Sequence, residues 1–327
     1  MLKVIAACGN GMGSSQMIKM KIEKVALLGA GAVGAYFIWG LSEKLGENFC
    51  VVAKGERKNR LEKEGLTING KKYPLLVKAP QEAGEVDLLL VSSKQDALPG
   101  ALEDIKTVVG QNTIVISLLN GVTSEEIIGN AIGMEHMLYA VMRIASVRDG
   151  NQIVFSPEHT AGIYIGEKGR KEPTERVLAV ENLFKNTGIR CNFVENIITD
   201  MWMKYASNIS QNLPQAILGV GFQAYKDSVH MHYIAECLWR EVAQVAKAKG
   251  ITLTENLVLF KGVKPDARFS TLQDLDAGRH TEIEMLAGEM IRMGKTCKIP
   301  VPYCEYTYHL IKTLEEKNDG KFEFGRK

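Results

Sequence analysis

The chain has 327 residues, a length that predicts about two domains. Hydrophobic residues make up 46% and charged residues 24%, a composition typical of globular proteins that argues against long disordered regions. The 40 Lys and Arg residues nearly balance the 38 Asp and Glu residues, and the net charge of +2 excludes a nucleic-acid partner held by bulk charge.

The six cysteines are scattered and form no C-x-x-C pair, so the sequence predicts neither a metal site nor a disulfide framework. Reduced thiols fit a cytoplasmic location. Residues 25–42 carry no charge, but their four glycines favour a strand, a turn and a packed helix over a membrane span. Residues 5–8 resemble a lipoprotein cleavage site, but the apolar stretch before Cys8 is too short. We therefore expect no membrane attachment.

Apolar, strand-like runs alternate with helical patterns in the first part of the chain. The runs cover residues 25–28, 49–53, 86–91 and 113–118. This alternation predicts an α/β domain with a parallel sheet. Residues 66–69 and 73–77 predict a small antiparallel pair, and residues 148–151 predict a hairpin turn.

The patterns become helical after about residue 195. Helices are predicted over residues 197–213, 229–249, 254–260, 271–295 and 303–317. We therefore expect three parts, namely an N-terminal extension over residues 1–19, an α/β domain over 20–195 and an all-helical domain over 196–327.

A glycine-rich loop follows the first strand of the α/β domain and has the pattern G-x-G-x-x-G. Gly29 permits the tight turn, Gly31 lets the backbone approach a pyrophosphate, and Gly34 lets the following helix pack against the strand. The helix N-terminus then faces the phosphates with free N–H groups. We expect this loop to bind a dinucleotide through Gly29, Ala30, Gly31, Ala32, Val33 and Gly34.

The residue after the second strand indicates which dinucleotide fits. An acidic side chain there binds the ribose hydroxyl of NAD, whereas a cation accepts the 2′-phosphate of NADP. Lys54 occupies this position, so the sequence favours NADP.

Lys204, Asn208 and Asn212 recur every fourth residue and would form one polar stripe on a helix. A cation with two amides suits a small oxyacid, although periodicity alone also fits a solvated helix face. Lys94 and Asn120 follow two predicted strands at the sheet edge where ligands bind.

Two further polar residues belong to the predicted helix near residue 271. Ser270 is placed to cap this helix, and Glu282 lies further along it. A capping role alone for Ser270 and a surface salt bridge for Glu282 are the alternatives.

Together these residues resemble the ketopantoate reductase family, from about residue 22 to the last helix. The resemblance implies a Rossmann-type domain and an all-α C-terminal domain like that of 6-phosphogluconate dehydrogenase. It implies reduction of the 2-oxo acid 2-dehydropantoate to (R)-pantoate with NADPH, on the route to pantothenate and coenzyme A. Two copies could also pair as a homodimer.

The resemblance also implies the roles of the site residues. Lys204 would be the general acid, and Glu282 would act beside it at the nicotinamide end. The substrate would be held by Asn120, Asn208, Asn212 and Ser270, and the cofactor also by Lys54, Lys94, Asn120 and Glu282. The family has Arg at the position of Lys54, which leaves the strictness of the NADP preference open.

Residues 1–24 resemble the start of a phosphotransferase-system IIB protein, in which a cysteine such as Cys8 carries a phosphoryl group. The rest of such a domain is absent, so a fused remnant is the expected interpretation. Two alternatives remain open for the whole chain, namely a reductase of another branched 2-oxo acid and a non-catalytic NADPH-binding sensor.

Overall fold

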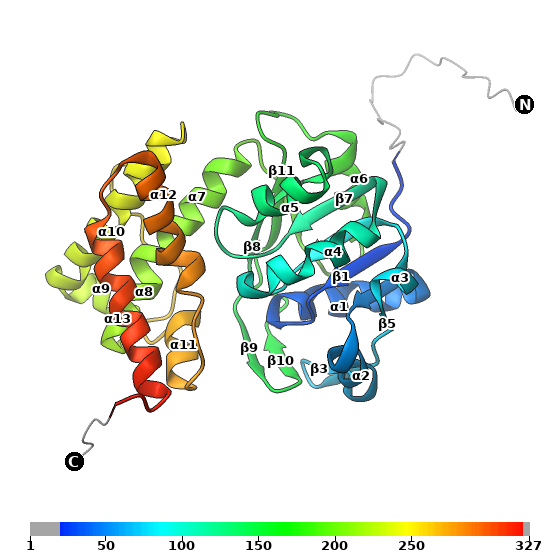
Figure 1. The fold of residues 1–327 in the computed structure, drawn as a ribbon, viewed down its shortest axis with the longest axis horizontal. Coiled ribbons are helices and arrows are strands. Elements are labelled where there is room, and N and C mark those ends of the chain that lie inside the picture. Colours follow the sequence, from blue (N-terminus) through cyan, green and yellow to red (C-terminus); the bar gives the residue numbers. More distant parts are fainter. Residues whose placement is uncertain (1–19, 323–327) are drawn as a thin grey trace, which may run out of the picture.

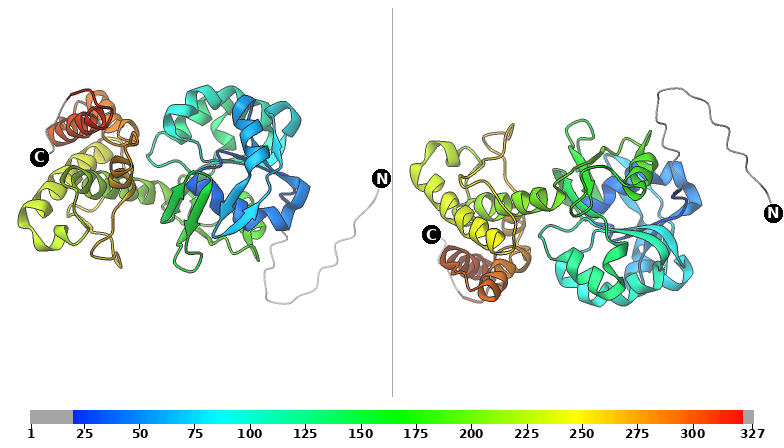
Figure 2. Two further views of the ribbon diagram at one scale, coloured as in Figure 1. Left: turned by 90° about the horizontal axis from the view of Figure 1, so that it is seen from below. Right: turned by 90° about the horizontal axis from the view of Figure 1, so that it is seen from above.

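A computed structural model of the protein describes residues 20–322 (Figure 1). Residues 1–19, which include Cys8 and most of the IIB-like stretch, lie outside the described residues. An α/β lobe and a helical lobe lie side by side, and helix α7 (Ile197–Ser207) leads from one to the other (Figures 1 and 2).

The α/β lobe is built on a five-stranded sheet whose paired strands all run parallel. Its strands, in spatial order, are β5 (Val77–Lys78), β2 (Phe49–Val52), β1 (Val25–Leu28), β6 (Val86–Val91) and β7 (Val109–Ser117). Alternate residues of β1 and β6 belong to two separate cores, one on each face of the sheet. Burial on both faces explains why these strands are continuous apolar runs.

Helices cover both faces of this sheet. One core contains α1 (Ala32–Leu45) and α6 (Glu175–Phe184), and the other contains α4 (Leu98–Val108) and α5 (Ser124–Ile132). Helices α2 (Gly55–Glu64) and α3 (Pro80–Ala83) complete the lobe.

Two small sheets extend the α/β lobe. The first contains β4 (Lys71–Tyr73), β3 (Leu66–Ile68), β10 (Gln152–Phe155) and β9 (Ser146–Asp149), and the second contains β12 (Cys191–Phe193), β11 (Gly162–Gly166) and β8 (Tyr139–Arg143). The pairing of Asp149 with Gln152 leaves a two-residue loop, which confirms the predicted hairpin turn.

The helical lobe surrounds α10 (Val229–Ala248), whose Trp239 is completely buried. Its other elements are a π-helical segment (Asn208–Asn212), α8 (Leu213–Leu218), α9 (Ala224–Asp227), α11 (Ser270–Asp276), a second π-helical segment (Glu284–Gly288), α12 (Glu289–Cys297) and α13 (Pro302–Asn318). No helix among residues 20–322 is long and apolar enough to cross a membrane.

The predicted antiparallel pair is present, but its second strand is β4 and not residues 73–77. Tyr73 ends β4, and β5 instead pairs in parallel with β2 in the main sheet. Pro74 lies between them and has no N–H for a sheet ladder, so the strand is interrupted there.

Two predicted helices also differ from the structure. Residues 254–260 are not helical, because their backbone is bound by a distant side chain: Gln211 donates to Val258 O at 3.0 Å and accepts from Phe260 N at 3.0 Å. The predicted helix over 271–295 breaks after Asp276, where Gly278 adopts a left-handed φ of 65°.

Candidate active site

The glycine-rich loop joins β1 to α1 as the sequence predicts. Gly29 has a φ of 109°, and a Cβ there would lie 2.6 Å from the backbone of Ser92. A Cβ on Gly34 would lie 2.1 Å from Gly29 O, whereas a Cβ on Gly31 would meet no backbone within 4 Å. Gly29 and Gly34 are therefore required by packing, and the position of Gly31 is open for the close approach of a ligand.

Lys204 lies at the centre of a polar chain that joins the two lobes. Its Nζ donates to Asn120 Oδ1 at 2.8 Å and to Met142 O at 2.7 Å. Asn120 Nδ2 in turn donates to Glu282 Oε2 at 3.1 Å. Three of the predicted site residues, from α7, the loop after β7 and the segment before α12, are thus brought together. The carbonyl of Met142, 62 positions before Lys204, is a partner that no sequence pattern identifies.

The two charged groups of this chain have shifted pKa values. Burial lowers the pKa of Lys204 to about 8, with a further lowering by Arg143, although Glu282 and Glu125 oppose the shift. Burial raises the pKa of Glu282, although the Asn120 hydrogen bond and the charge of Lys94 oppose it. The lysine is therefore closer to neutrality than an exposed lysine, as a proton donor at neutral pH requires.

The predicted amides lie in the π-helical segment that continues α7. Asn208 and Asn212 are buried, with 8% and 6% exposure. The predicted α-helical spacing of the polar stripe is wrong beyond residue 207, because the turn over residues 208–212 is π-helical. Pro214 cannot donate to Ser210 O, and a π turn at this point absorbs the gap in the hydrogen-bond ladder.

Four buried side-chain atoms among the described residues have no hydrogen-bond partner, and all lie on segments of the candidate site. They are Ser93 Oγ, Gln95 Oε1, Ser210 Oγ and Asn212 Oδ1. The first two follow β6 beside the glycine loop, and the other two lie in the π-helical segment. Because buried polar groups are normally paired, these atoms fit polar ligand groups at two places, one beside the glycine loop and one beside the π-helical segment.

Two predicted site residues have surroundings that the sequence did not predict. Ser270 is exposed and is the first residue of α11, whose N-cap is Phe269 with no side-chain hydrogen bond, so the predicted capping role is wrong. Lys54 Nζ pairs with Asp104 Oδ1 at 2.7 Å, and its side chain is thereby occupied by a carboxylate of α4.

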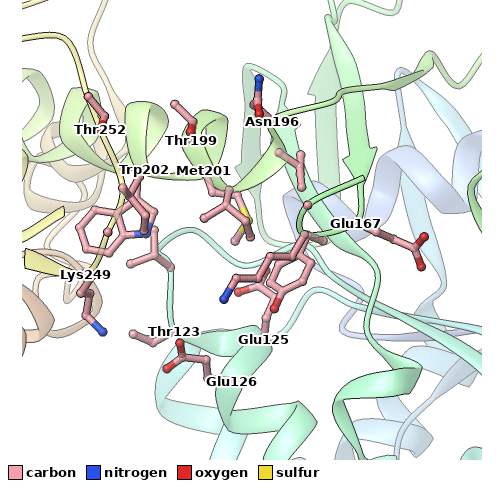
Figure 3. Close-up of a pocket in the computed structure, with 18 of the residues that line it drawn as sticks. Thr123, Glu125, Glu126, Glu167, Asn196, Thr199, Met201, Trp202, Lys249 and Thr252 are labelled. Atoms are coloured by element: carbon pink, nitrogen blue, oxygen red, sulfur yellow. The ribbon is translucent and has the colours of Figure 1, made fainter. Parts of the chain in front are cut away.

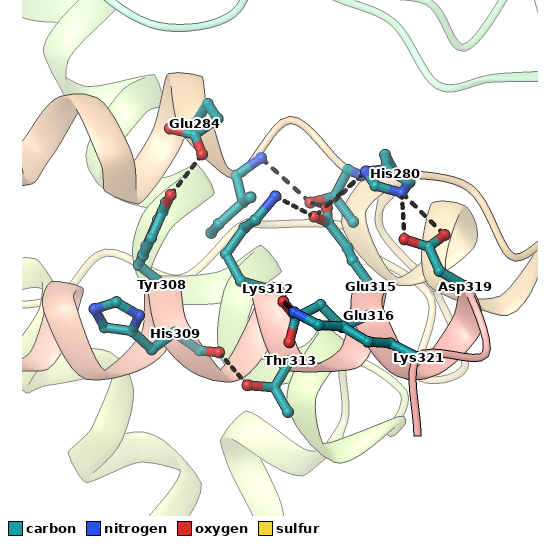
Figure 4. A network of polar contacts seen from close by, with 12 residues as sticks. His280, Glu284, Tyr308, His309, Lys312, Thr313, Glu315, Glu316, Asp319 and Lys321 are labelled. Carbon is teal, nitrogen blue, oxygen red and sulfur yellow. Dashed lines mark hydrogen bonds and ion pairs between the residues drawn. The ribbon is translucent and has the colours of Figure 1, made fainter. Parts of the chain in front are cut away.

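Thr281, the residue before Glu282, is bound by a carboxylate that the sequence analysis did not identify. Glu315 of α13, only 2% exposed, accepts from Thr281 N and Thr281 Oγ1, each at 2.7 Å, and from Lys312 Nζ at 2.8 Å (Figure 4). His280 bonds Asp319, the residue that follows α13, at 3.0 Å and also pairs with Glu315, so it is part of the same polar network. No local sequence signal connects Thr281 to a residue 34 positions away.

A cavity of about 580 Å³ lies between the two lobes and contains none of the predicted site residues (Figure 3). Its lining includes Glu125 and Tyr139 from the α/β lobe and Trp202 and Lys249 from the helical lobe. Glu125 is 2% exposed, and burial raises its pKa to about 7, although the charge of Lys204 opposes this shift. No group of three or more metal-ligating side chains occurs within the described residues.

Comparisons with known proteins agree with this architecture. A family model described as ketopantoate reductase PanE/ApbA matches residues 25–169, and its C-terminal counterpart matches residues 196–315. A third model, the lactose/cellobiose-specific IIB subunit of the phosphotransferase system, matches residues 3–31.

Individual relatives span nearly the whole chain. A 2-dehydropantoate 2-reductase of Pyrococcus horikoshii is 30% identical over 310 residues, which cover 91% of this chain and 99% of that protein. The uncharacterized oxidoreductase YkpB of Bacillus subtilis is 26% identical, with 89% and 99% covered.

Solved structures show the same fold. A D-mandelate dehydrogenase with NADH and anilino(oxo)acetate has a TM-score of 0.77 at 23% identity, over 90% of this chain and 99% of that chain. A PanE/ApbA family ketopantoate reductase of Ralstonia eutropha has a TM-score of 0.74 at 25% identity, with the same coverage. The protein is thus an oxidoreductase with a Rossmann-type domain and a helical C-terminal domain. It belongs to the ketopantoate reductase PanE/ApbA family.

Proposed function

We propose that the protein reduces 2-dehydropantoate to (R)-pantoate with NADPH in the cytoplasm, as a step toward pantothenate and coenzyme A. The observation that carries this proposal is the partly buried Lys204, bonded to Asn120, which is bonded in turn to Glu282. The names of the relatives, including the reductase of Pyrococcus horikoshii, support the choice of substrate. We take residue 195, in the link between β12 and α7, as the domain boundary, and a homodimer as the assembly.

The α/β lobe fits a nicotinamide dinucleotide. The N-terminus of α1 has no side-chain cap, and Gly31 leaves its approach open. Ser93 Oγ and Gln95 Oε1 offer unpaired polar atoms nearby. The cofactor-binding set is the loop of Gly29, Ala30, Gly31, Ala32, Val33 and Gly34 together with Lys54, Lys94, Asn120 and Glu282. When bound, the nicotinamide supplies the hydride that reduces the ketone carbon.

Lys204 acts as the general acid. An ammonium group has three N–H donors, and two are used by Asn120 Oδ1 and Met142 O. The third is available for the ketone oxygen, on which negative charge develops during reduction. Lys204 then transfers its proton to this oxygen, and its pKa of about 8 favours the transfer.

The remaining residues orient the reacting groups. Glu282 fixes the amide of Asn120, which keeps Oδ1 directed at the lysine. Asn208 and Asn212 hold the hydroxyl and carboxylate of the substrate, and the unpaired Oδ1 of Asn212 accepts a hydrogen bond from the hydroxyl. Ser270, exposed at the start of α11, contacts the substrate carboxylate.

The first test is the oxidation of NADPH at 340 nm with a panel of 2-oxo acids, repeated with NADH. Selective turnover of 2-dehydropantoate with NADPH is the expected result. Selective reduction of another 2-oxo acid, whether branched or the aromatic 2-oxo acid that corresponds to mandelate, would support the same hydride chemistry and overturn the choice of substrate. Tight NADPH binding without turnover of any acid would favour a sensor over an enzyme.

A further inference from the structure

Arg148 lies beside the glycine-rich loop, within electrostatic range of two further arginines. A Cβ on Gly31 would lie 3.8 Å from Arg148 Nη1, so this guanidinium borders the point where a dinucleotide phosphate approaches the backbone. Partial burial lowers the pKa of Arg148, and the positive charges of Arg57 and Arg60 lower it further. The guanidinium of Arg148 therefore lies within electrostatic range of both other arginines.

The topology of the small sheet explains why these residues meet. Arg57 and Arg60 are three positions apart on α2, so they lie on one side of the helix. Helix α2 leads directly into β3, which pairs with β10, and β10 pairs with β9, which carries Arg148. Figure 1 shows the β9–β10 hairpin on the same side of the lobe as β3 and α2.

The cluster has cations without matching anions. No described carboxylate forms an ion pair with Arg57, Arg60 or Arg148. The hydrogen bond from Arg148 Nε to Gly150 O, at 2.9 Å, fixes the side chain and leaves its two terminal nitrogens available. Lys54, in contrast, is already paired with Asp104.

We propose that Arg148, together with Arg57 and Arg60, binds the 2′-phosphate of NADP and determines the preference for this cofactor over NAD. This inference rests on the proposed use of a nicotinamide dinucleotide. A phosphate dianion matches three unpaired cations, and the planar fork of Arg binds phosphate oxygens in pairs. Arg148 of the β9–β10 hairpin thus distinguishes NADP from NAD, a role that the sequence analysis assigned to Lys54.

The test compares the affinities for NADPH and NADH in wild-type protein and in Arg148→Gln, by quenching of intrinsic fluorescence. We expect the Kd for NADPH to rise about tenfold, or about 1.4 kcal/mol, because charge-assisted contacts to the 2′-phosphate are lost. The Kd for NADH should stay within about twofold. Arg57→Gln should show the same selective loss, and Arg148→Lys a smaller one.

Arg240→Gln is the matched control, because it removes the same charge from an exposed arginine in the helical lobe. It should leave both affinities unchanged, and the melting temperature of each variant without cofactor reports its folding. An equal loss for NADPH and NADH would assign Arg148 to the shared pyrophosphate and overturn the inference. An unchanged preference for NADPH over NADH in both Arg148→Gln and Arg57→Gln would also overturn the inference. A wild-type protein that binds neither cofactor would instead refute the proposed function itself.

Discussion

Lys204 differs from a surface lysine in its burial and in its pKa. Two acceptors fix its ammonium group, and burial brings its pKa to about 8. A fixed group needs little reorganisation when charge develops on a nearby oxygen. At the scale of single residues, the proposed chemistry therefore depends most directly on this side chain.

Replacement of Lys204 by Ala should lower kcat by about 100-fold or more, the range typical for loss of a general acid. Steady-state kinetics with the identified 2-oxo acid would measure this effect. The Kd for NADPH serves as the control and should change little. A variant with near-normal kcat would remove Lys204 from the mechanism.

The pKa of Lys204 also predicts the pH dependence of the reduction. The protonated lysine is the active form, so kcat/KM should be constant below about pH 8 and fall about tenfold per pH unit above it. The charge of Glu282 raises the pKa of Lys204, so Glu282→Gln should move this limb to lower pH. If kcat/KM falls at the same pH in wild type and in Glu282→Gln, Lys204 is not the group whose ionisation causes the fall.

The elements of the two lobes show which structures a local sequence pattern predicts and which it does not. The glycine-rich loop and the strands of the parallel sheet depend on local spacing and burial, and they were predictable. The non-helical residues 254–260 depend on Gln211, and the break after Asp276 leads to Thr281, which Glu315 binds. Side chains far away in the sequence satisfy these backbone groups, and no local pattern records such contacts.

The same distinction between local and long-range contacts applies to the residues of the candidate site. Lys204 and Asn120 could be placed from the sequence because one lies on a predicted helix and the other follows a predicted strand. Glu282 was expected on a helix that ends at Asp276, so its place beside Asn120 rests on the family resemblance and on the structure. The pairing of Lys54 with Asp104 and the approach of Arg148 to Gly31 join separate elements, so they required the three-dimensional structure.

The π-helical segment offers a test within one element. Asn208→Ala should raise KM about fivefold with a smaller effect on kcat, because about 1 kcal/mol of hydrogen bonding to the substrate is lost. Ser207→Ala is the control, since it removes a neighbouring buried polar atom that is already bonded to Met203 O. An unchanged KM and kcat/KM in Asn208→Ala would exclude substrate binding by this residue.

Helix α13 should stabilise the segment that carries Glu282. Glu315→Gln should lower the free energy of unfolding by about 1–3 kcal/mol, because the buried donors of Thr281 and the half-buried ammonium of Lys312 lose a charged acceptor. Its neighbour Glu316, whose side chain is 42% exposed and pairs with Lys321, should tolerate the same change within about 0.5 kcal/mol. Urea denaturation measures both variants, and equal effects would contradict a specific role for Glu315.

At the scale of the whole molecule, the two lobes meet at α7 and around the cavity between them (Figures 1 and 3). Glu125 lies at this junction, nearly completely buried, and accepts from Ser124 Oγ at 3.0 Å. The charge of Lys204 lowers the pKa of Glu125, and the charge of Glu125 raises that of Lys204. The ionisation of one buried carboxylate thus connects the stability of the fold to the candidate site.

Burial raises the pKa of Glu125 from 4.5 to about 7, so the folded protein holds this proton more tightly than the unfolded chain. Its contribution to stability is present below about pH 4.5 and is lost as pH rises to about 7, by on the order of 3 kcal/mol. Glu125→Gln cannot ionise, so it should melt higher than wild type at pH 8 and differ less at pH 5. Calorimetry at both pH values measures this, with the exposed Glu126→Gln as the control. Equal slopes of melting temperature against pH in wild type and Glu125→Gln would show that Glu125 does not titrate in this range.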